Sequence, residues 1–197
     1  MKAKYKRILL KISGESLAGE KRHGFSSPAL IATAKQIAAL NKSGVEVGVV
    51  VGGGNFWRGR EGDEMDRTSA DYMGMLATVI NALALSDALD RQNVDNRVMT
   101  ALTIDKIGEP YNVKTAKRYL AEGKVVIFGG GTGSPFFTTD TGASLKACEI
   151  GADALLLAKN VDGIYDGDPK TNPSAKKYSA LTYDEYVAKG LKALDTS

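Results

Sequence analysis

Three short apolar segments of this chain run directly into loops that carry glycine, and this arrangement most constrains the fold. The pairs are Lys6–Ile12 with Ser13-Gly14, Val45–Val51 with Gly52–Gly54, and Lys124–Phe128 with Gly129–Gly133. Segments that are apolar at almost every position are typical of strands covered on both faces. The sequence therefore predicts a sheet buried between layers of helices.

Helical segments separate these strands along the chain. The predicted helices are a segment from Ser27 that stops at Gly44, then Ala70–Arg91, Val113–Glu122, Thr139–Ile150 and Leu181–Lys189, and the further strands are Val94–Leu102 and Ala154–Ala158. Ser27 is the expected N-cap of the first helix because Pro28 follows it. Strands that alternate with helices predict an α/β fold with a parallel sheet and helices on both of its faces.

The composition predicts one domain and argues against several functions. The chain has 197 residues, of which 43% are hydrophobic and 25% charged, as in ordinary globular domains. A net charge of +3 is too small to indicate a nucleic-acid partner. The single cysteine, Cys148, argues against disulfides, and the single histidine, His23, argues against a zinc site or a Ser-His-Asp hydrolase.

The chain is also expected to have no membrane partner. No apolar window approaches the ~20 residues that a membrane-spanning helix needs, and the short apolar stretch near the N-terminus is not a signal peptide. We therefore expect a cytoplasmic protein.

The glycine loops predict a phosphate-binding site. In open parallel sheets, ligands bind beyond the carboxyl ends of the strands. Glycine there lets backbone N–H groups approach an anion. One such loop alone is better interpreted as a strand-to-helix turn, but three at one edge of a sheet favour phosphate.

Two familiar phosphate motifs do not fit. The pattern G-x-x-x-x-G-K-[ST] does not occur, which argues against a P-loop kinase. The dinucleotide pattern G-x-G-x-x-G is incomplete, because Trp57 and Ser134 stand where a third glycine is required. A nicotinamide dehydrogenase is therefore disfavoured.

Five segments together resemble the bacterial uridylate kinase family. They are Lys11-Ile-Ser-Gly-Glu15, Gly52-Gly-Gly-Asn-Phe-Trp-Arg-Gly59, Ala70-Asp-Tyr-Met-Gly-Met-Leu-Ala-Thr78, Gly131-Thr-Gly-Ser-Pro-Phe-Phe-Thr-Thr-Asp140 and Val161-Asp-Gly-Ile-Tyr-Asp-Gly-Asp-Pro169. Their order and spacing agree with the family, and the resemblance extends from Lys6 to Asp195. It implies the amino-acid kinase (carbamate kinase-like) fold, a three-layer αβα sandwich with a mostly parallel sheet. It also implies ATP-dependent phosphorylation of UMP to UDP, in pyrimidine nucleotide biosynthesis, by direct in-line transfer.

The resemblance assigns catalytic roles to Lys11, Arg58 and Asp140. A phosphoryl-transfer site needs fixed cations beside the migrating group, because negative charge spreads over its oxygens. Lys11 would supply one cation, and the guanidinium of Arg58 would bind phosphate oxygens. Asp140, at the start of a helix, would orient Lys11. Alone, Lys11 would be interpreted as a solvated lysine and Asp140 as a helix cap.

The resemblance also divides two nucleotides between the loops. The implied ATP residues are Lys11, Ile12, Ser13, Gly14, Gly54, Arg58, Lys159, Asn160, Tyr165 and Asp168. The implied UMP residues are Gly53, Asp71, Thr132, Gly133, Ser134, Pro135, Phe136, Phe137, Thr138 and Thr139. Asp71 is expected in the first turn of its helix with its carboxylate on the UMP ribose, and Phe136 and Phe137 are expected to pack their loop against the sheet.

Regulation and assembly are implied in the same way. Family members respond to GTP as an activator and UTP as an inhibitor, and the GTP-sensing segment matches Gly19, Glu20, Lys21, Arg22, His23 and Gly24. Read by itself, that segment is a charged, exposed loop in which His23 faces solvent. Mg²⁺ would be held mainly by the ATP phosphates, with no metal-binding residues from the protein. The helix around Met73–Leu85 is apolar nearly all round, which is compatible with the homohexamers of the family.

Two other functions remain open. One is a kinase of the same fold that acts on a carboxylate or carbamate, such as glutamate or acetylglutamate; the Thr132–Thr139 loop favours the nucleotide. The other is a non-enzymatic nucleotide- or oxyanion-binding protein, against which Lys11 and Arg58 argue. Family members continue beyond the segment matching Leu191–Asp195, so residues 1–197 are expected to form a single domain that lacks the usual C-terminal segment.

Overall fold

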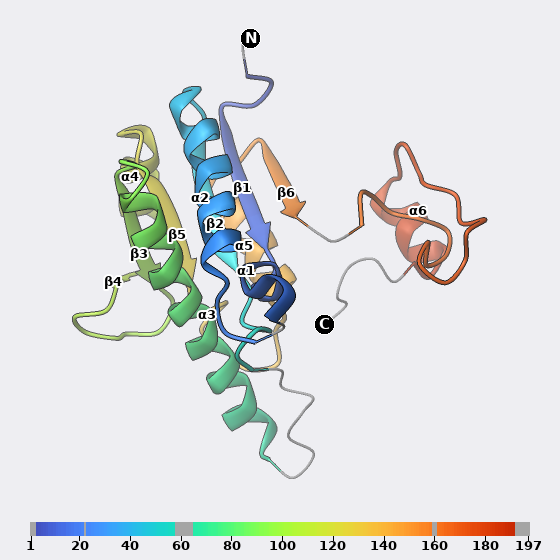
Figure 1. Cartoon of the computed structure of the whole chain (residues 1–197), viewed down its shortest axis with the longest axis horizontal. Helices are drawn as coiled ribbons and strands as arrows, with labels where there is room; N and C mark the ends of the chain where they lie inside the picture. Colours follow the sequence, from blue (N-terminus) through green and yellow to red (C-terminus); the bar gives the residue numbers. More distant parts are fainter. Residues whose placement is uncertain (1–2, 22, 58–64, 159–160, 192–197) are drawn as a thin grey trace. The chain divides into compact units, whose positions relative to one another are not determined.

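The computed structural model describes residues 3–21, 23–57, 65–158 and 161–191. They fall into two compact units, Met1–Ala158 and Lys159–Ser197, and each unit is described by itself. The elements are β1 (Arg7–Ile12), α1 (Gly14–Ala18), a 3₁₀ turn η1 (Gly19–Lys21), α2 (Ser27–Lys42), β2 (Glu46–Val51), α3 (Arg67–Asp90), β3 (Asn96–Thr100), β4 (Glu109–Pro110), α4 (Val113–Ala121), β5 (Val125–Gly129), α5 (Thr139–Ile150), β6 (Ala154–Ala158) and α6 (Tyr183–Ala188) (Figure 1). The expectation of a single domain stays a prediction.

The strands of the first unit form one parallel sheet. Its order is β4-β3-β5-β2-β1-β6, and every recorded strand pair is parallel. Parallel neighbours bring all carboxyl ends to one edge. The strands that run into the glycine loops, β5, β2 and β1, are adjacent in this order, so the loops emerge side by side.

Helices cover both faces of the sheet, which confirms the predicted three-layer sandwich. On one face, Val47, Val49 and Val51 of β2 pack into a core that includes residues of α1, α2 and α3. On the other face, Leu9, Val50 and Phe128 pack with residues of α4 and α5. Alternate residues of each strand therefore enter different cores, as the two-residue repeat of a strand requires.

Helix α3 begins one turn earlier than predicted. Its N-cap is Asp66, whose carboxylate accepts a hydrogen bond from the Ser69 N–H at 2.9 Å. The helix therefore starts at Arg67 rather than Ala70. As a result Asp71 lies beyond the first turn, and the prediction that it opens the helix was wrong.

The same helix corrects a second expectation. By length and composition alone, Arg67–Asp90 could cross a membrane, with a mean hydropathy of 1.4 in its apolar window. The statement that no window approaches this length was therefore wrong. Half of that window is buried inside the molecule, where Ala82, Leu85 and Leu89 enter the core. This packing is that of a core helix in the sandwich.

Three local features differ from the sequence expectation. The N-cap of α2 is Ser26 rather than Ser27, and its side chain makes no capping hydrogen bond. Helix α1 was not predicted; it forms because Ser13 caps it, accepting from the Ser16 N–H at 3.3 Å. Strand β4 was also missed, because its two residues carry no periodic pattern.

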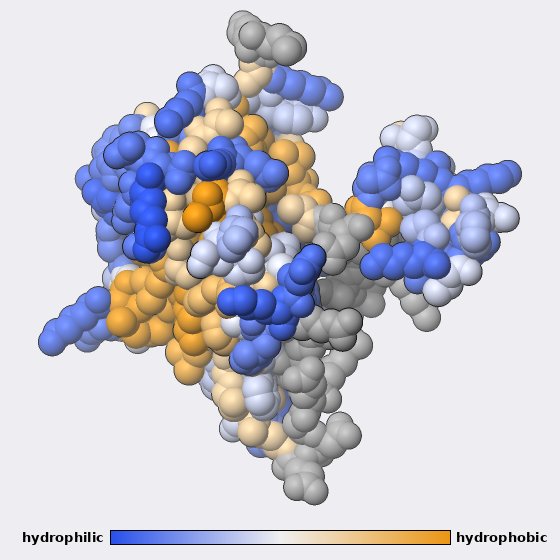
Figure 2. Space-filling model, in the orientation of Figure 1, coloured by the Kyte–Doolittle hydropathy of each residue, from blue (hydrophilic) through white to orange (hydrophobic). Residues whose placement is uncertain are grey.

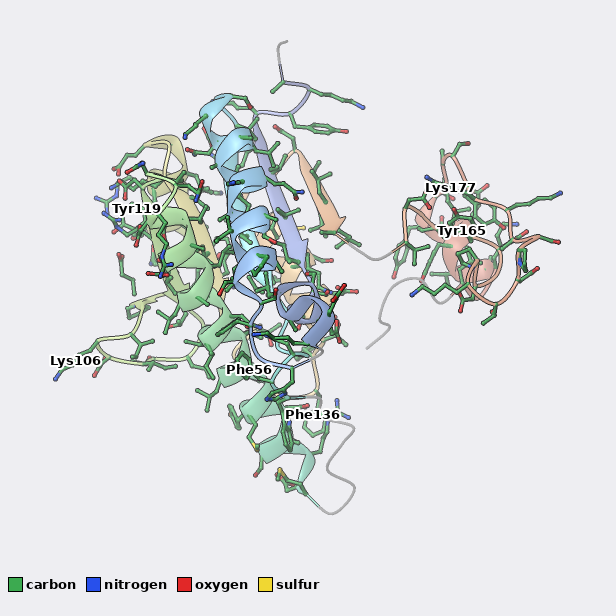
Figure 3. All side chains as sticks on the ribbon, in the orientation of Figure 1. Phe56, Lys106, Tyr119, Phe136, Tyr165 and Lys177 are labelled. Carbon is green, nitrogen blue, oxygen red and sulfur yellow. The ribbon has the colours of Figure 1, made fainter. Side chains whose placement is uncertain are left out.

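The second unit is a loop-rich segment that ends in α6. Thr182 and Glu185 form a reciprocal capping box at the start of this helix. Tyr165 and Lys177, labelled in Figure 3, are paired by an isolated antiparallel bridge. Lys177 Nζ also lies 2.8 Å from Asp162 Oδ2.

Candidate active site

A buried ion pair lies at the carboxyl end of the sheet. Lys11, near the end of β1, places its Nζ 2.7 Å from Oδ1 of Asp140 in the first turn of α5. Both side chains are only 9% exposed. Thr138 caps α5, and the positive end of the helix dipole favours a carboxylate at Asp140. The pair holds an ammonium group in a fixed position beside the glycine loops.

The loops after β1 and β2 are in direct contact. A Cβ at Gly14 would lie 2.5 Å from Asn55 Oδ1, 2.7 Å from the Gly52 carbonyl oxygen and 2.9 Å from the Gly54 nitrogen. No side chain fits at these distances. Gly14 is therefore required for the close approach of the two backbones.

Helix α3 lies against the loop after β2. A Cβ at Gly53 would lie 2.8 Å from the Gly74 carbonyl oxygen and 2.9 Å from the Ala77 Cβ. On the same side of the helix, Asn81 Nδ2 donates to the Gly52 carbonyl oxygen at 2.6 Å. The glycine loop is thus fixed between α1 and α3.

The loop after β5 is fixed to α3 as well. The Gly130 N–H donates to Thr78 Oγ1 at 2.7 Å. Further along, Thr132 Oγ1 donates to the Ser134 carbonyl oxygen at 3.0 Å and accepts from the Ser134 N–H at 3.1 Å. These bonds shape the turn in which the resemblance places a phosphate.

Asp71 binds the loop after β5 at Phe136. Its Oδ2 accepts a hydrogen bond from the Phe136 N–H at 2.7 Å, and both of its oxygens lie about 3 Å from Arg67 Nε. Phe136 has a φ of 71°, which is uncommon outside glycine, and this hydrogen bond stabilises it there. The guanidinium of Arg67 also lies 5.4 Å from the centre of the Phe136 ring. Arg67, Asp71 and Phe136 therefore form one clamp on the loop.

The expectation that Phe136 and Phe137 pack this loop against the sheet was wrong. Their side chains are 60% and 56% exposed, and Figure 3 labels Phe136 on this loop. Hydrogen bonds to α3, rather than apolar packing, hold the loop. Two exposed aromatic rings therefore border the candidate UMP site.

The candidate regulatory segment contacts the loop after β2. The Gly24 N–H donates to the Asn55 carbonyl oxygen at 3.0 Å, and Asn55 Nδ2 donates back to the Gly24 carbonyl oxygen at 2.9 Å. Phe56 packs edge-to-face on Phe25, with ring centres 5.0 Å apart, and on His23 at 5.6 Å. His23 is exposed, as predicted.

A second buried lysine, Lys146, lies on α5 itself. Lys146 Nζ donates to Glu149 Oε2 at 3.0 Å and lies 3.5 Å from the centre of the Tyr111 ring. Tyr111 Oη donates to the same carboxylate oxygen at 2.6 Å. Burial of Tyr111 and its hydrogen bond to Glu149 raise the pKa of the phenol. Although burial opposes it, hydrogen bonds from Tyr111 and Lys146 lower the pKa of Glu149.

The described residues of the first unit do not include six of the predicted site residues. Arg22, Arg58, Lys159 and Asn160 lie outside the described residues. Tyr165 and Asp168 lie in the second unit. There Tyr165 Oη donates to Asp162 Oδ1 at 2.7 Å, and Asp168 Oδ1 accepts from the Lys170 N–H at 2.9 Å.

Four residues of the site were missed by the sequence reasoning. They are Asn55, Arg67, Thr78 and Asn81, which bond to Gly24, Asp71, Gly130 and Gly52 respectively. One signal was available: Thr78 and Asn81 are polar residues three positions apart in the otherwise apolar stretch Met73–Leu85, which puts them on one face of the helix. Arg67 carried no such signal, because an arginine at a helix start is ordinary.

The fold and this arrangement define a class of protein. A parallel three-layer sandwich whose adjacent strands end in glycine loops around a buried lysine–aspartate pair is suited to binding phosphate groups. The family model described as "Amino acid kinase family" matches residues 6–197. The chain belongs to this family.

Three solved structures are similar to this chain over most of its length. A UMP kinase from Bacillus anthracis matches with a TM-score of 0.94 and 42% identity, over 97% of this chain and 80% of that one. A UMP kinase from Ureaplasma parvum matches with a TM-score of 0.92 and 39% identity, over 98% and 83%. A uridylate kinase from Archaeoglobus fulgidus matches with a TM-score of 0.70 and 31% identity, over 95% and 81%.

Proposed function

We propose that this chain transfers the γ-phosphoryl group of ATP to UMP and so forms UDP and ADP. The observation that carries the proposal is the buried Lys11–Asp140 pair among three adjacent glycine loops, in a chain 42% identical to a UMP kinase. The same arrangement offers a cation held beside glycine loops, which suits a reaction between two phosphate groups. A kinase of a carboxylate or carbamate is less well supported, because the similar structures named above are UMP and uridylate kinases.

The proposed transfer is direct. An oxygen of the UMP phosphate forms a bond to the γ-phosphorus, and the bond between that phosphorus and the β–γ bridging oxygen breaks, so the electron pair leaves with ADP. The ammonium of Lys11 would stabilise the negative charge on the transferring group, with Asp140 holding it in place. No general base is needed, because the attacking phosphate is already an anion.

The loops would divide the two nucleotides. ATP would lie on the side of Ile12, Ser13, Gly14 and Gly54, where the loops after β1 and β2 meet. UMP would lie between Gly53, Asp71 and the Thr132–Thr139 loop. Arg58, Lys159, Asn160, Tyr165 and Asp168 would complete the ATP side, as the family resemblance implies. An Asp71 carboxylate already bonded to Phe136 could accept a ribose hydroxyl while keeping the loop closed.

Magnesium would enter as part of the Mg-ATP substrate. Among the described residues, no group of three His, Cys, Asp or Glu side chains is close enough to hold a metal ion. Phosphate oxygens and water satisfy the octahedral preference of Mg²⁺. Lys11, held by Asp140, would then act on the phosphate group rather than on the metal.

We further propose that the protein self-associates through α3. Tyr72, Met73, Leu76, Ile80 and Leu83 are 37–47% exposed along this helix, and Figure 2 shows apolar side chains gathered there. A stripe of this length is typical of an interface. We propose that this apolar surface of α3 contributes to a homohexamer.

We also propose that GTP activates the enzyme and that UTP inhibits it, with Gly19–Gly24 as the GTP-sensing segment. The enzyme is proposed to be cytoplasmic.

The test is ADP formation from Mg-ATP with a panel of acceptors. The panel contains UMP, CMP, dUMP, AMP, GMP, glutamate and acetylglutamate. We expect turnover with UMP far ahead of the others. Turnover with glutamate or acetylglutamate instead would contradict the proposal that UMP is the substrate. Binding of UMP without any turnover would favour a non-enzymatic nucleotide-binding protein.

A further inference from the structure

Two buried polar side chains interrupt the apolar surface of α3. Thr78 is 4% exposed and Asn81 is fully buried. Being three positions apart, they lie on the same face of the helix, one turn from each other. A buried polar group costs free energy unless it is hydrogen-bonded, so their partners indicate why they are there.

Thr78 is bonded to the loop after β5. Its hydroxyl lies 2.6 Å from the Met75 carbonyl oxygen, which can only accept, so the hydroxyl donates there. The remaining lone pairs of Oγ1 accept the Gly130 N–H at 2.7 Å. The threonine therefore uses both roles of its hydroxyl, and one of them fixes the first residue after β5.

Asn81 and Asn55 form a reciprocal amide pair under the loop after β2. Asn81 Nδ2 donates to Asn55 Oδ1 at 2.7 Å, and Asn55 Nδ2 donates to Asn81 Oδ1 at 3.0 Å. The second N–H of each amide goes to a backbone carbonyl, Gly52 for Asn81 and Gly24 for Asn55. Because carbonyls only accept, the orientation of both amides is determined. All of these groups are satisfied together.

We propose that Thr78 and Asn81 are positioning residues that set the two nucleotide loops separately from one rigid helix. Thr78 holds the loop after β5, and Asn81 with Asn55 holds the loop after β2 against Gly14. Neither contacts a nucleotide in this proposal; each acts through a backbone group. The assignment of a nucleotide to each loop rests on the proposed function.

This arrangement predicts a crossed kinetic pattern. Thr78→Val has the same shape but no hydroxyl, so it should raise the KM for UMP about tenfold and leave the KM for ATP nearly unchanged. Thr78→Ser retains the hydroxyl and should restore the wild-type KM. Asn81→Leu releases a loop that carries both Gly53, on the UMP side, and Gly54, on the ATP side. It should raise the KM for ATP by more than that for UMP, because UMP is also held by the Thr132–Thr139 loop.

Two variants separate positioning from loss of stability. Asn81→Leu leaves the Asn55 amide buried without its partner, so the double variant Asn55→Leu with Asn81→Leu removes both amides together. It should show the same rise in the KM for ATP. Leu89→Val, in the apolar part of the same helix, lowers stability without removing a hydrogen bond. It should leave both KM values unchanged.

Amide hydrogen exchange on the free protein tests the positions of the loops without any substrate. Thr78→Val should speed exchange of the Gly130 N–H about tenfold, and Thr78→Ser should not. If the wild type does not phosphorylate UMP, the proposed function is wrong. The exchange of the Gly130 N–H still tests the positioning role of Thr78, because it does not depend on activity. Unchanged Gly130 exchange in Thr78→Val, or equal changes of both KM values in all variants, would overturn the inference.

Discussion

Two buried lysines contact acidic groups of α5, and only one of them lies at the candidate active site. Lys11 faces Asp140 at the carboxyl end of the sheet, beside the glycine loops. Lys146 faces Glu149 and the Tyr111 ring near the other end of α5. Their side chains are 9% and 6% exposed. The lysine proposed to be catalytic and the lysine outside the site therefore share both burial and an acidic partner.

The difference lies in what surrounds each ammonium. Lys146 is covered by an aromatic ring at 3.5 Å, and its carboxylate partner is also bonded to the phenol of Tyr111. Lys11 lies near the end of β1, where the glycine loops after β1 and β2 pack together, and glycine loops at the ends of parallel strands favour anions. The surroundings of Lys146 satisfy its charge within the fold, whereas those of Lys11 could accept a phosphate. Variants at the two lysines and at their partners test this difference.

Replacing Lys11 tests the catalytic side of the comparison. Lys11→Ala should lower kcat with UMP by about 10³-fold, because the charge on the transferring group loses its fixed cation. UMP binding, measured by calorimetry, should persist because the loop after β5 is held by α3 instead. Equal loss of binding and turnover would contradict the role given to Lys11.

Replacing Asp140 tests whether Lys11 needs its partner. Asp140→Asn keeps the shape but removes the charge that holds the ammonium, and kcat should fall about 10²-fold. Glu149→Gln is the matched change on the same helix and should leave kcat near the wild-type value. Steady-state assays of both variants decide the point; a larger loss in Glu149→Gln would reverse the comparison.

Replacing Lys146 tests the structural side. Lys146→Met should lower the free energy of unfolding by about 1–2 kcal/mol, because the contact with the Tyr111 ring and the bond to Glu149 are lost. Its kcat should not change. Denaturant unfolding measures the first quantity, with the exposed Lys35→Met as control. A fall in kcat without a fall in stability would mean that Lys146 serves the reaction.

Removing the hydroxyl of Tyr111 should lower the free energy of unfolding by less than replacing Lys146 does. Tyr111→Phe keeps the ring beneath Lys146 but deletes the hydrogen bond to Glu149, and stability should fall by about 1 kcal/mol. Tyr183→Phe, at a 76% exposed position, should change nothing. Similar unfolding midpoints for both variants would show that the Tyr111–Glu149 bond contributes little.

The smallest effect is a dependence on pH. Because the pKa of Glu149 is lower in the folded chain than its ordinary value, its ionised form stabilises the fold. This contribution is complete above the unfolded pKa of about 4.3 and is lost as pH falls through the lower, folded pKa. The stability difference between the wild type and Glu149→Gln should therefore be larger at pH 7 than at pH 3. An equal stability difference at pH 7 and pH 3 would show that ionisation of Glu149 does not stabilise the fold.

The order of the elements and most of their bounds follow from local sequence. Helix α5 begins and ends at the predicted residues, as does strand β6, because apolar periodicity, caps and glycines act over a few positions. Predictions failed where competing local signals were close together. Asp66 caps α3 by accepting the Ser69 N–H, so the helix starts one turn before Ala70 and Asp71 lies beyond its first turn.

The sequence by itself determined that apolar strands would end in glycine loops and that Lys11 would stand at the end of the first strand. Tertiary structure alone decided that β5, β2 and β1 are neighbours, so that these loops meet. It also decided the bonds that shape the site, such as Asn81 to Asn55, Gly130 to Thr78 and Phe136 to Asp71, whose partners are 26, 52 and 65 residues apart. Hydrogen bonds of this kind have no local signature, since they depend on how α3 packs across the ends of the strands.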